Sequence, residues 1–133
     1  MRGRISRPTT FTSTSKPVFR PGDVVYVNLD PTKGAEKSKV RPCLVLEAGA
    51  SPLPLVIVLP ITEDNGRRGR LFVPIGDYSG AGLAKPSAVD CYQIRCLDVE
   101  RLDARVGEVT EDVLEKVRRT LAIILDIGKE HVT

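Results

Sequence analysis

The sequence predicts a mainly β protein with α additions, an α+β class in which a small barrel of short strands precedes one C-terminal helix. Short apolar runs rich in Val, Ile and Leu alternate with turns that contain Gly, Pro or Asn along residues 22–109. About five or six such runs are typical of a small barrel. Helical periodicity marks the end of the chain, at residues 111–127. The length of 133 residues indicates one domain with one core, because this is the usual domain size.

Two predicted strands flank a polar loop near the start of the domain. Residues 24–29 and 43–46 are apolar runs with strand composition, and Pro31 and Gly34 favour a turn between them. A loop that only connects two core strands does not require so many charged residues, so we interpret this loop as a place where an anion binds. The charges in question are Lys33, Glu36, Lys37, Lys39 and Arg41.

The third predicted strand, residues 53–61, is apolar throughout and has the length of a central strand buried on both faces. Thr62 follows directly at its end. After an Asn-Gly turn signal, residues 71–75 are predicted as a strand. Pro74, which cannot donate to a ladder, indicates either an edge position or the end of this strand.

A glycine-rich loop at residues 76–85 then leads into a strand over residues 86–97, with a bend inside it. We expect a short helical turn at residues 99–102 and a brief strand at residues 106–109.

The C-terminal helix is predicted from its spacing and its ends. Thr110 suits the N-cap because its hydroxyl can accept from the first turn, and Gly128 suits the C-terminal cap. We interpret the charges on its other face as a solvated surface. Its apolar residues recur every three or four positions; they are Val113, Leu114, Val117, Leu121, Ile124 and Leu125.

Positive charge is concentrated at the N-terminus. Residues 1–20 hold five cations and no acid, whereas the whole chain has a formal net charge of +3, so the rest is slightly acidic. We expect residues 1–19 to be a disordered or loosely docked basic extension and residues 20–133 to be the folded domain. The extension either holds a polyanion loosely or is only a solvated leader.

The composition excludes several classes of protein. No apolar run approaches the roughly 20 residues of a membrane span, so we expect a cytoplasmic protein with no membrane partner. The three cysteines, Cys43, Cys91 and Cys96, lie in strand-like runs and are interpreted as reduced core thiols. His131 is the sole histidine and lies near the end of the chain, which argues against a zinc site and a histidine-activated nucleophile. We therefore expect neither a metal nor a cofactor.

The cations and hydroxyls at strand ends suit work on a phosphodiester. RNA carries its own nucleophile, the 2′-hydroxyl, so an enzyme that cleaves it needs no metal and no nucleophilic side chain. It must stabilise charge on the phosphorane, and a planar guanidinium meets two phosphate oxygens at once. Arg41, fixed by Pro42 at the entrance to a strand, is the best candidate. Thr62 can donate its hydroxyl to the same phosphate.

On these residues, the sequence resembles the MazF/PemK/Kid family of toxin endoribonucleases from toxin–antitoxin pairs. The elements GD-x-V, LDPT-x-G-x-E, RP and Q-I-R occur in the family's order, and the match covers nearly all of residues 20–128. The matching stretches are GDVVYVNLDPTKGAEKSKVRPCLVLE (22–47), VLPIT (58–62), FVPI (72–75), SAVDCYQIRCLD (87–98) and RLDARVGEVT (101–110), followed by the helix.

The resemblance implies an SH3-like small barrel of the CcdB/MazF type, with about five to seven strands and a C-terminal helix, and it implies a homodimer. It implies a sequence-selective, metal-independent endoribonuclease that cleaves single-stranded RNA to a 2′,3′-cyclic phosphate and a 5′-hydroxyl. The RNA is expected to be mRNA, with tRNA and rRNA as other classes. A cognate antitoxin is expected to cover the RNA groove with its C-terminal segment.

Carried over residue by residue, the resemblance makes Arg41 the catalytic arginine and Thr62 the catalytic threonine. One family branch has a histidine where this chain has Ala35, and an arginine and an aspartate where it has Asp90 and Tyr92. If this chain cleaves RNA, it must therefore follow the branch that uses arginine and threonine. The expected RNA-binding residues are Glu36, Lys37, Lys39, Ser87, Asp90 and Gln93.

Other interpretations remain open for these residues. Arg41 could simply pair with Glu36 or Asp90, and Ser87 and Gln93 could close local backbone hydrogen bonds. At the level of function, the same barrel resembles gyrase-poisoning toxins, which bind a protein and cut nothing. A third interpretation is an RNA-binding relative that has lost its activity.

Overall fold

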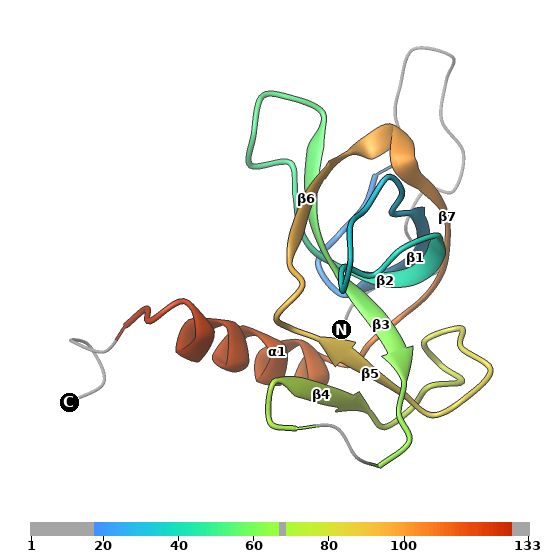
Figure 1. The fold of residues 1–133 in the computed structure, drawn as a ribbon, viewed down its shortest axis with the longest axis vertical. Coiled ribbons are helices and arrows are strands. Elements are labelled where there is room, and N and C mark those ends of the chain that lie inside the picture. The colour runs from blue at the N-terminus through green and yellow to red at the C-terminus, as the bar shows by residue number, and fades with distance from the viewer. Residues whose placement is uncertain (1–17, 67–68, 129–133) are drawn as a thin grey trace.

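The computed structural model of this chain describes residues 18–66 and 69–128. Residues 1–17 of the predicted basic extension, and His131, lie outside these ranges. Within the described ranges, seven strands form one antiparallel sheet that curls into an open barrel, and one α-helix follows (Figure 1). The predicted fold class is thus confirmed. The elements are β1 (Asp23–Asn28), β2 (Val40–Ala48), β3 (Leu55–Glu63), β4 (Phe72–Ile75), β5 (Ser87–Asp90), β6 (Arg95–Asp98), the 3-10 helix η1 (Val99–Arg101), β7 (Leu102–Glu108) and α1 (Glu111–Ile124).

Strand β3 belongs to two parts of the sheet. The strands are ordered β4-β5-β3-β2-β1-β7, and β6 also pairs with β3. Up to Pro60, β3 pairs with β2 and β6, whereas from Ile61 onward it pairs with β5. Figure 1 shows β3 leaving the ring of strands towards β4 and β5. The result is a barrel and a small sheet (β4, β5 and the end of β3) that share one strand.

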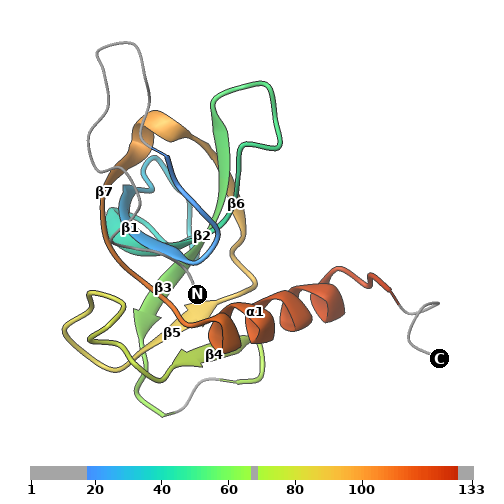
Figure 2. The same cartoon turned by 180° about the vertical axis from the view of Figure 1, so that it is seen from behind.

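Two hydrophobic clusters stabilise these two parts. Val56 and Val58 of β3 face into the barrel, where they join a cluster that we call the barrel core. Leu59 and Ile61 of the same strand belong to a second cluster, the helix-side core, which includes buried residues of β4, β5 and α1. Figure 2 shows α1 lying beside β4 and β5. The prediction that this strand is buried on both faces is confirmed. Phe19 packs against the barrel core from the N-terminal side.

Several predicted boundaries were wrong. Strand β2 begins at Val40, so Arg41 lies inside the strand and not before it. The strand predicted over residues 86–97, with a bend inside it, is two strands, β5 and β6, separated by a turn at the place of the expected bend. Strand β7 starts at Leu102 and is much longer than predicted. Its register with β1 is irregular and several of its charged residues are exposed, so its sequence lacks the regular alternation that predicts a strand.

The helix ends three residues earlier than predicted, at Ile124. Asp126 adopts a left-handed backbone with φ 57, and its N–H donates to the carbonyl of Ile123 at 3.2 Å. The N–H of Ile127 donates to the carbonyl of Ala122 at 2.8 Å. These two bonds form a Schellman motif, in which the left-handed residue is Asp126 and not a glycine. Asp tolerates the left-handed backbone better than most residues do. The prediction that Gly128 caps the helix was therefore wrong.

Strands β1 and β7 are joined by a buried ion pair. The side chain of Asp23 is fully buried, and its Oδ1 accepts from Nε of Arg105 at 2.9 Å. Its Oδ2 accepts from the backbone N–H of Arg20 at 2.8 Å, and Arg105 also contacts Glu108 at 3.0 Å. Because the buried carboxylate has both a charged and a backbone partner, its desolvation is compensated.

The loop at residues 76–85 approaches β7 so closely that Gly107 has no room for a side chain. A Cβ on Gly107 would collide with the backbone carbonyl of Ala81. On the other side of the contact, a Cβ on Gly82 would collide with the carbonyl of Val106. The two backbones therefore pack directly on each other.

Candidate active site

Arg41 and Thr62 lie at the corner where β3 leaves β2. The ladder between these strands ends at the pair formed by Cys43 and Pro60. Arg41 lies two residues beyond Cys43 on β2, and Thr62 lies two residues beyond Pro60 on β3. Since side chains alternate along a strand, Arg41 and Thr62 share the face of that last pair. The structure therefore brings the two predicted residues to one corner of the sheet.

This corner is on the face opposite α1. Ile61 and Val89 pair with each other and point into the helix-side core. Thr62, which is 9% exposed, and Asp90, which is 3% exposed, alternate with them and point the other way. The corner thus combines a guanidinium, a hydroxyl and a carboxylate from three strands.

The side chain of Arg41 is held by its own loop. Its Nε donates to the carbonyl of Ser38 at 2.9 Å, and the residue is half-buried. Because Nε is engaged, a forked contact with a phosphate would come from Nη1 and Nη2. The interpretation that Arg41 pairs with Glu36 or Asp90 finds no support in the described ion pairs, in which Asp90 faces Lys37 instead, with Nζ and Oδ2 4.0 Å apart.

Gln93 binds the loop between β1 and β2. Its Oε1 accepts from the backbone N–H of Lys37 at 2.7 Å, and its Nε2 donates to the carbonyl of Ala35 at 3.3 Å. Both ends of the amide are therefore engaged with backbone. This geometry favours the alternative in which Gln93 closes backbone hydrogen bonds over its expected contact with RNA.

The other expected RNA-binding residues are spread around the corner. Glu36 accepts from the N–H of Lys33 at 2.7 Å, within its own loop and not beside Arg41. Lys39 is exposed and adopts a left-handed backbone with φ 66. Ser87 is 6% exposed, donates to the carbonyl of Lys85 at 2.8 Å, and shares the face of Val89 rather than that of Thr62.

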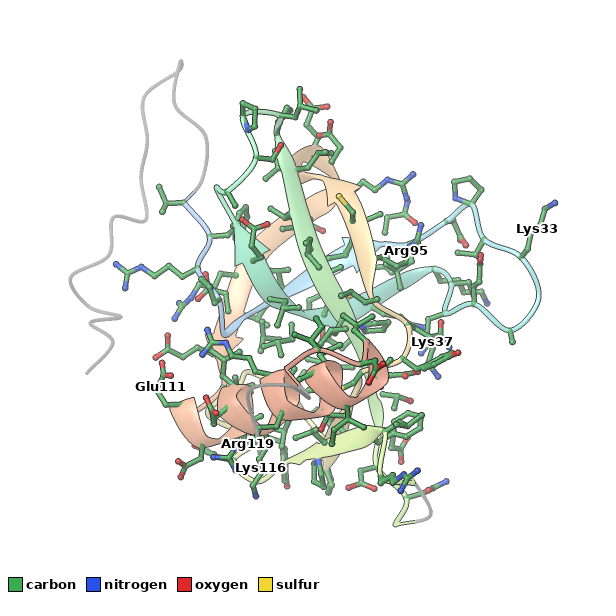
Figure 3. The ribbon with its side chains drawn as sticks, turned by 90° about the vertical axis from the view of Figure 1, so that its left-hand side faces the viewer. Lys33, Lys37, Arg95, Glu111, Lys116 and Arg119 are labelled. Carbon is green, nitrogen blue, oxygen red and sulfur yellow. The ribbon has the colours of Figure 1, made fainter. Side chains whose placement is uncertain are left out.

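Two arginines to which the sequence analysis assigned no role also bind the loop between β1 and β2. Nη1 of Arg95 donates to the carbonyl of Leu29 at 2.7 Å. Nη1 of Arg101 donates to the carbonyl of Asp30 at 2.9 Å. In Figure 3, Lys37 and Arg95 lie near the base of the loop, while Lys33 points away from the barrel. The sequence did contain a signal for Arg95, because it is the arginine of the Q-I-R element, but nothing indicated that its partner is the backbone of Leu29.

The thiols near the site are not nucleophiles. Burial raises the pKa of Cys43 to about 12, although the nearby guanidiniums of Arg95 and Arg41 oppose this shift. Burial also raises the pKa of Cys91 to about 12, and the charge of Asp90 acts in the same direction. Because a thiolate is the reactive form, both thiols are inert at neutral pH.

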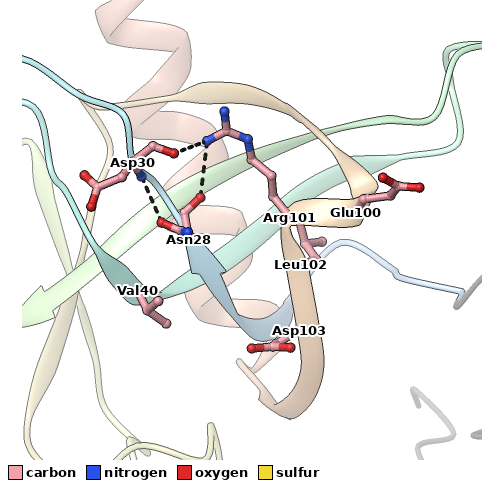
Figure 4. Close-up of a pocket in the computed structure, with 7 residues that line it drawn as sticks. All are labelled: Asn28, Asp30, Val40, Glu100, Arg101, Leu102 and Asp103. Carbon is pink, nitrogen blue, oxygen red and sulfur yellow. Dashed lines mark hydrogen bonds between the residues drawn. The ribbon is translucent and has the colours of Figure 1, made fainter.

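A depression of about 440 Å³ lies beside Asn28 and Asp30, where the loop between β1 and β2 begins, on the face opposite Arg41 (Figure 4). Arg101 crosses it to reach the backbone of Asn28 and Asp30. Since Asn28 and Val40 pair with each other and alternate with Arg41, the depression faces away from the corner. Its lining consists of Asn28, Asp30, Val40, Glu100, Arg101, Leu102 and Asp103.

Two further observations concern residues 18–66 and 69–128 only. These ranges contain no group of three or more His, Cys, Asp or Glu side chains that could hold a metal ion. Their one α-helix is too short and too polar to cross a membrane.

Residues 20–125 match the model of a family described as the PemK-like, MazF-like toxin of type II toxin–antitoxin systems. A curated relative, Endoribonuclease EndoA of Bacillus subtilis, is 30% identical over 111 residues, which are 81% of this chain and 95% of that protein. The crystal structure of MazF from Deinococcus radiodurans has a TM-score of 0.72 and 27% identity, and it covers 84% of this chain and all of that chain. The MazE–MazF structure from the same organism has a TM-score of 0.63 and 25% identity over 85% of this chain and all of that one.

Proposed function

This chain belongs to the PemK-like, MazF-like toxin family of type II toxin–antitoxin systems, and on that premise we propose that it is an endoribonuclease that cleaves single-stranded RNA. The observation that carries the proposal is the corner itself, where Arg41 and Thr62 share one face of the sheet. The relative EndoA is named an endoribonuclease, and this supports RNA as the substrate.

The chemistry follows from what the corner offers to a phosphodiester. The 2′-hydroxyl of the RNA attacks phosphorus and its proton passes to water, the bond from phosphorus to the 5′-oxygen breaks, and that oxygen takes up a proton, so that no proton is gained or lost overall. Arg41 stabilises the charge of the phosphorane through Nη1 and Nη2, and it is the candidate donor of a proton to the leaving oxygen. Thr62 donates its hydroxyl to the same phosphate. The products are a 2′,3′-cyclic phosphate and a 5′-hydroxyl, and no step needs a metal ion.

Cations around the corner extend the contact with RNA. Lys37 and Lys39 attract the phosphates that flank the cleaved bond. Asp90 accepts from a base or holds Lys37, since its Oδ2 faces the Lys37 ammonium at 4.0 Å. Selectivity for a sequence arises from such contacts with base edges.

The partners follow from the family. We propose a cytoplasmic homodimer that a cognate antitoxin inhibits, and the MazE–MazF structure supports the antitoxin as a partner. Light scattering that gives the mass of one chain would count against the homodimer.

The activity is tested by incubating purified protein with single-stranded RNAs of varied sequence in EDTA and mapping the new 5′ ends. We expect cleavage at a short preferred sequence, with 5′-hydroxyl ends. The Arg41→Ala and Thr62→Val variants are the matched controls and should leave the RNA intact. RNA that stays intact at high concentrations of the wild-type protein would refute the proposal, and tight binding without cleavage would favour an inactive relative. Inhibition of DNA gyrase without cleavage of RNA would favour the protein-binding alternative.

A further inference from the structure

Two side chains from the segment after β5 hold the loop that precedes Arg41. We call Gln93 and Arg95 the clasp, and residues 29–39 the β1–β2 loop. Gln93 binds the loop at Ala35 and Lys37. Arg95 binds the first residue of the loop, Leu29, at 2.7 Å. The clasp therefore fixes the loop at its start and near its tip, across more than fifty positions of sequence.

We propose that Arg95 is a positioning residue for Arg41, and that Gln93 assists it by holding the far part of the same loop. This inference rests on the proposed endoribonuclease function, because it concerns the placement of the guanidinium that would act on RNA. It assigns to Gln93 a task inside the protein instead of a contact with RNA.

Three hydrogen bonds, joined by short stretches of backbone, connect Arg95 to Arg41. Arg95 donates to the carbonyl of Leu29, and the N–H of Leu29 donates to the carbonyl of Lys39 at 2.9 Å. The neighbouring carbonyl, that of Ser38, accepts from Nε of Arg41 at 2.9 Å. Leu29 is fully buried in the barrel core, so it provides a rigid reference point. Losing the bond from Arg95 removes the donor to the Leu29 carbonyl, and with it one of the restraints that orient Arg41 through Lys39 and Ser38.

The surroundings of Arg95 suit this task. It is half-buried, and its position on β6 is paired with Val58 in the centre of β3. Arg95 and Arg41 both lie close enough to Cys43 to affect its pKa. The two guanidiniums therefore share one neighbourhood, where one is bound to the protein backbone and the other is the candidate for phosphate binding.

The first experiment separates positioning from RNA contact by steady-state kinetics. We expect Arg95→Ala to lower kcat by about 100-fold, because a displacement of about 1 Å in a reacting group costs this much. KM and its dependence on salt should change little. Arg95→Lys keeps one donor for the Leu29 carbonyl and should recover about tenfold of the loss. Arg119→Ala removes an arginine of the exposed helix surface and serves as the control with wild-type kcat.

Two kinetic outcomes would overturn the proposal. An unchanged kcat in Arg95→Ala would show that Arg41 does not depend on Arg95. A raised KM, with a slope of log KM against log salt reduced by about 0.7 and kcat retained, would make Arg95 a direct phosphate contact.

The second experiment does not depend on activity and therefore distinguishes failure of this inference from failure of the proposed function. Amide hydrogen exchange is measured in the wild type, Arg95→Ala and Gln93→Ala. We expect exchange in the peptide that covers residues 29–39 to accelerate by about tenfold or more, as the loss of such hydrogen bonds predicts, while the barrel strands keep their protection. Unchanged exchange in the loop, or equal acceleration throughout the barrel, would overturn the clasp, whether or not the wild-type protein cleaves RNA.

Discussion

Nε of Arg105 lies 2.9 Å from Oδ1 of Asp23, a carboxylate with no exposed surface. This contact joins β1 to β7, the strand that departs most from its prediction. Arg105→Ala removes the guanidinium that faces this buried carboxylate, and we expect it to lower the free energy of unfolding by about 3–5 kcal/mol. Urea unfolding measures this loss. Arg119→Ala, which removes an exposed ion pair with Glu115, should cost no more than about 0.5 kcal/mol. Similar losses in the two variants would contradict the assignment.

Arg41→Lys tests the need for a planar fork. Lysine keeps the charge but cannot present two parallel donors to a phosphate. We expect a loss of about 10²–10³ in kcat, close to that of Arg41→Ala, because one preorganised donor is worth about this much. The melting temperature of both variants should stay near that of the wild type. A lysine variant with full activity would show that charge alone suffices.

Lys39 carries the left-handed backbone, φ 66, beside the carbonyl that holds Arg41. Such a conformation costs a non-glycine residue about 1–2 kcal/mol. We therefore expect Lys39→Gly to leave stability unchanged or to raise it by up to about 1 kcal/mol, since glycine loses more chain entropy on folding. Lys39→Val should lower stability by more than that amount and reduce cleavage. Thermal unfolding of the two variants provides the comparison, and a more stable valine variant would refute the prediction.

Gly107→Ala introduces a methyl group where the backbone of Ala81 already lies. We expect a loss of about 1–3 kcal/mol in the free energy of unfolding, the usual cost of overpacking. Gly76 begins the loop that contains Ala81, and no atom would meet a Cβ placed there. Gly76→Ala is therefore the matched control and should be close to neutral. Chemical denaturation of both variants checks this, and equal stabilities would mean that the loop can move away from β7.

The buried thiols predict how stability depends on pH. Their pKa is raised by burial from 9.0 to about 12 in the folded protein. Folding therefore favours the neutral thiol, so this contribution is complete below pH 9 and is lost as the pH rises towards 12. The loss is at most about 4 kcal/mol per thiol and about 2 kcal/mol at pH 10.5.

Urea unfolding at pH 8 and pH 10.5 measures this effect. The free energy of unfolding of Cys91→Ala should fall less between the two pH values than that of the wild type. Cys96 is exposed, so its interpretation as a core thiol was wrong. It provides the control, since Cys96→Ala should follow the wild type. Equal slopes for all three proteins would mean that Cys91 ionises freely in the folded state.

The parts of the fold that the sequence predicted well are those with a strong local pattern. Strand β3 is apolar throughout because it is buried on both faces, and α1 has a clear helical period with Thr110 at its N-cap, where Oγ accepts from Val113 at 3.4 Å. Strand β7 was largely missed because its charged residues pair with other elements, as Arg105 does with Asp23. A period-based prediction cannot detect partners that lie 82 positions away.

The same limit applies to the candidate site. Arg41 and Thr62 were selected by residue type and position at strand ends, and the register of β2 and β3 brings them to one corner. The contacts of Gln93 and Arg95 with the β1–β2 loop join a side chain to backbone, and any residue at Leu29 or Lys37 would offer the same carbonyl or N–H. Because these bonds do not depend on which residue supplies the backbone atom, the sequence cannot predict them and the structure is needed to find them.

The change of pairing partner along β3, from β2 to β5, limits where insertions and deletions can occur in this chain. Because β3 leaves β2 after Pro60 and joins β5 at Ile61, one added or deleted residue at this point would reverse the side chains in the rest of β3. Thr62 would then point towards α1, and Ile61 would lose its apolar surroundings. Natural insertions and deletions should therefore collect in the surface connections, such as residues 49–54, and spare the junction between residues 58 and 63.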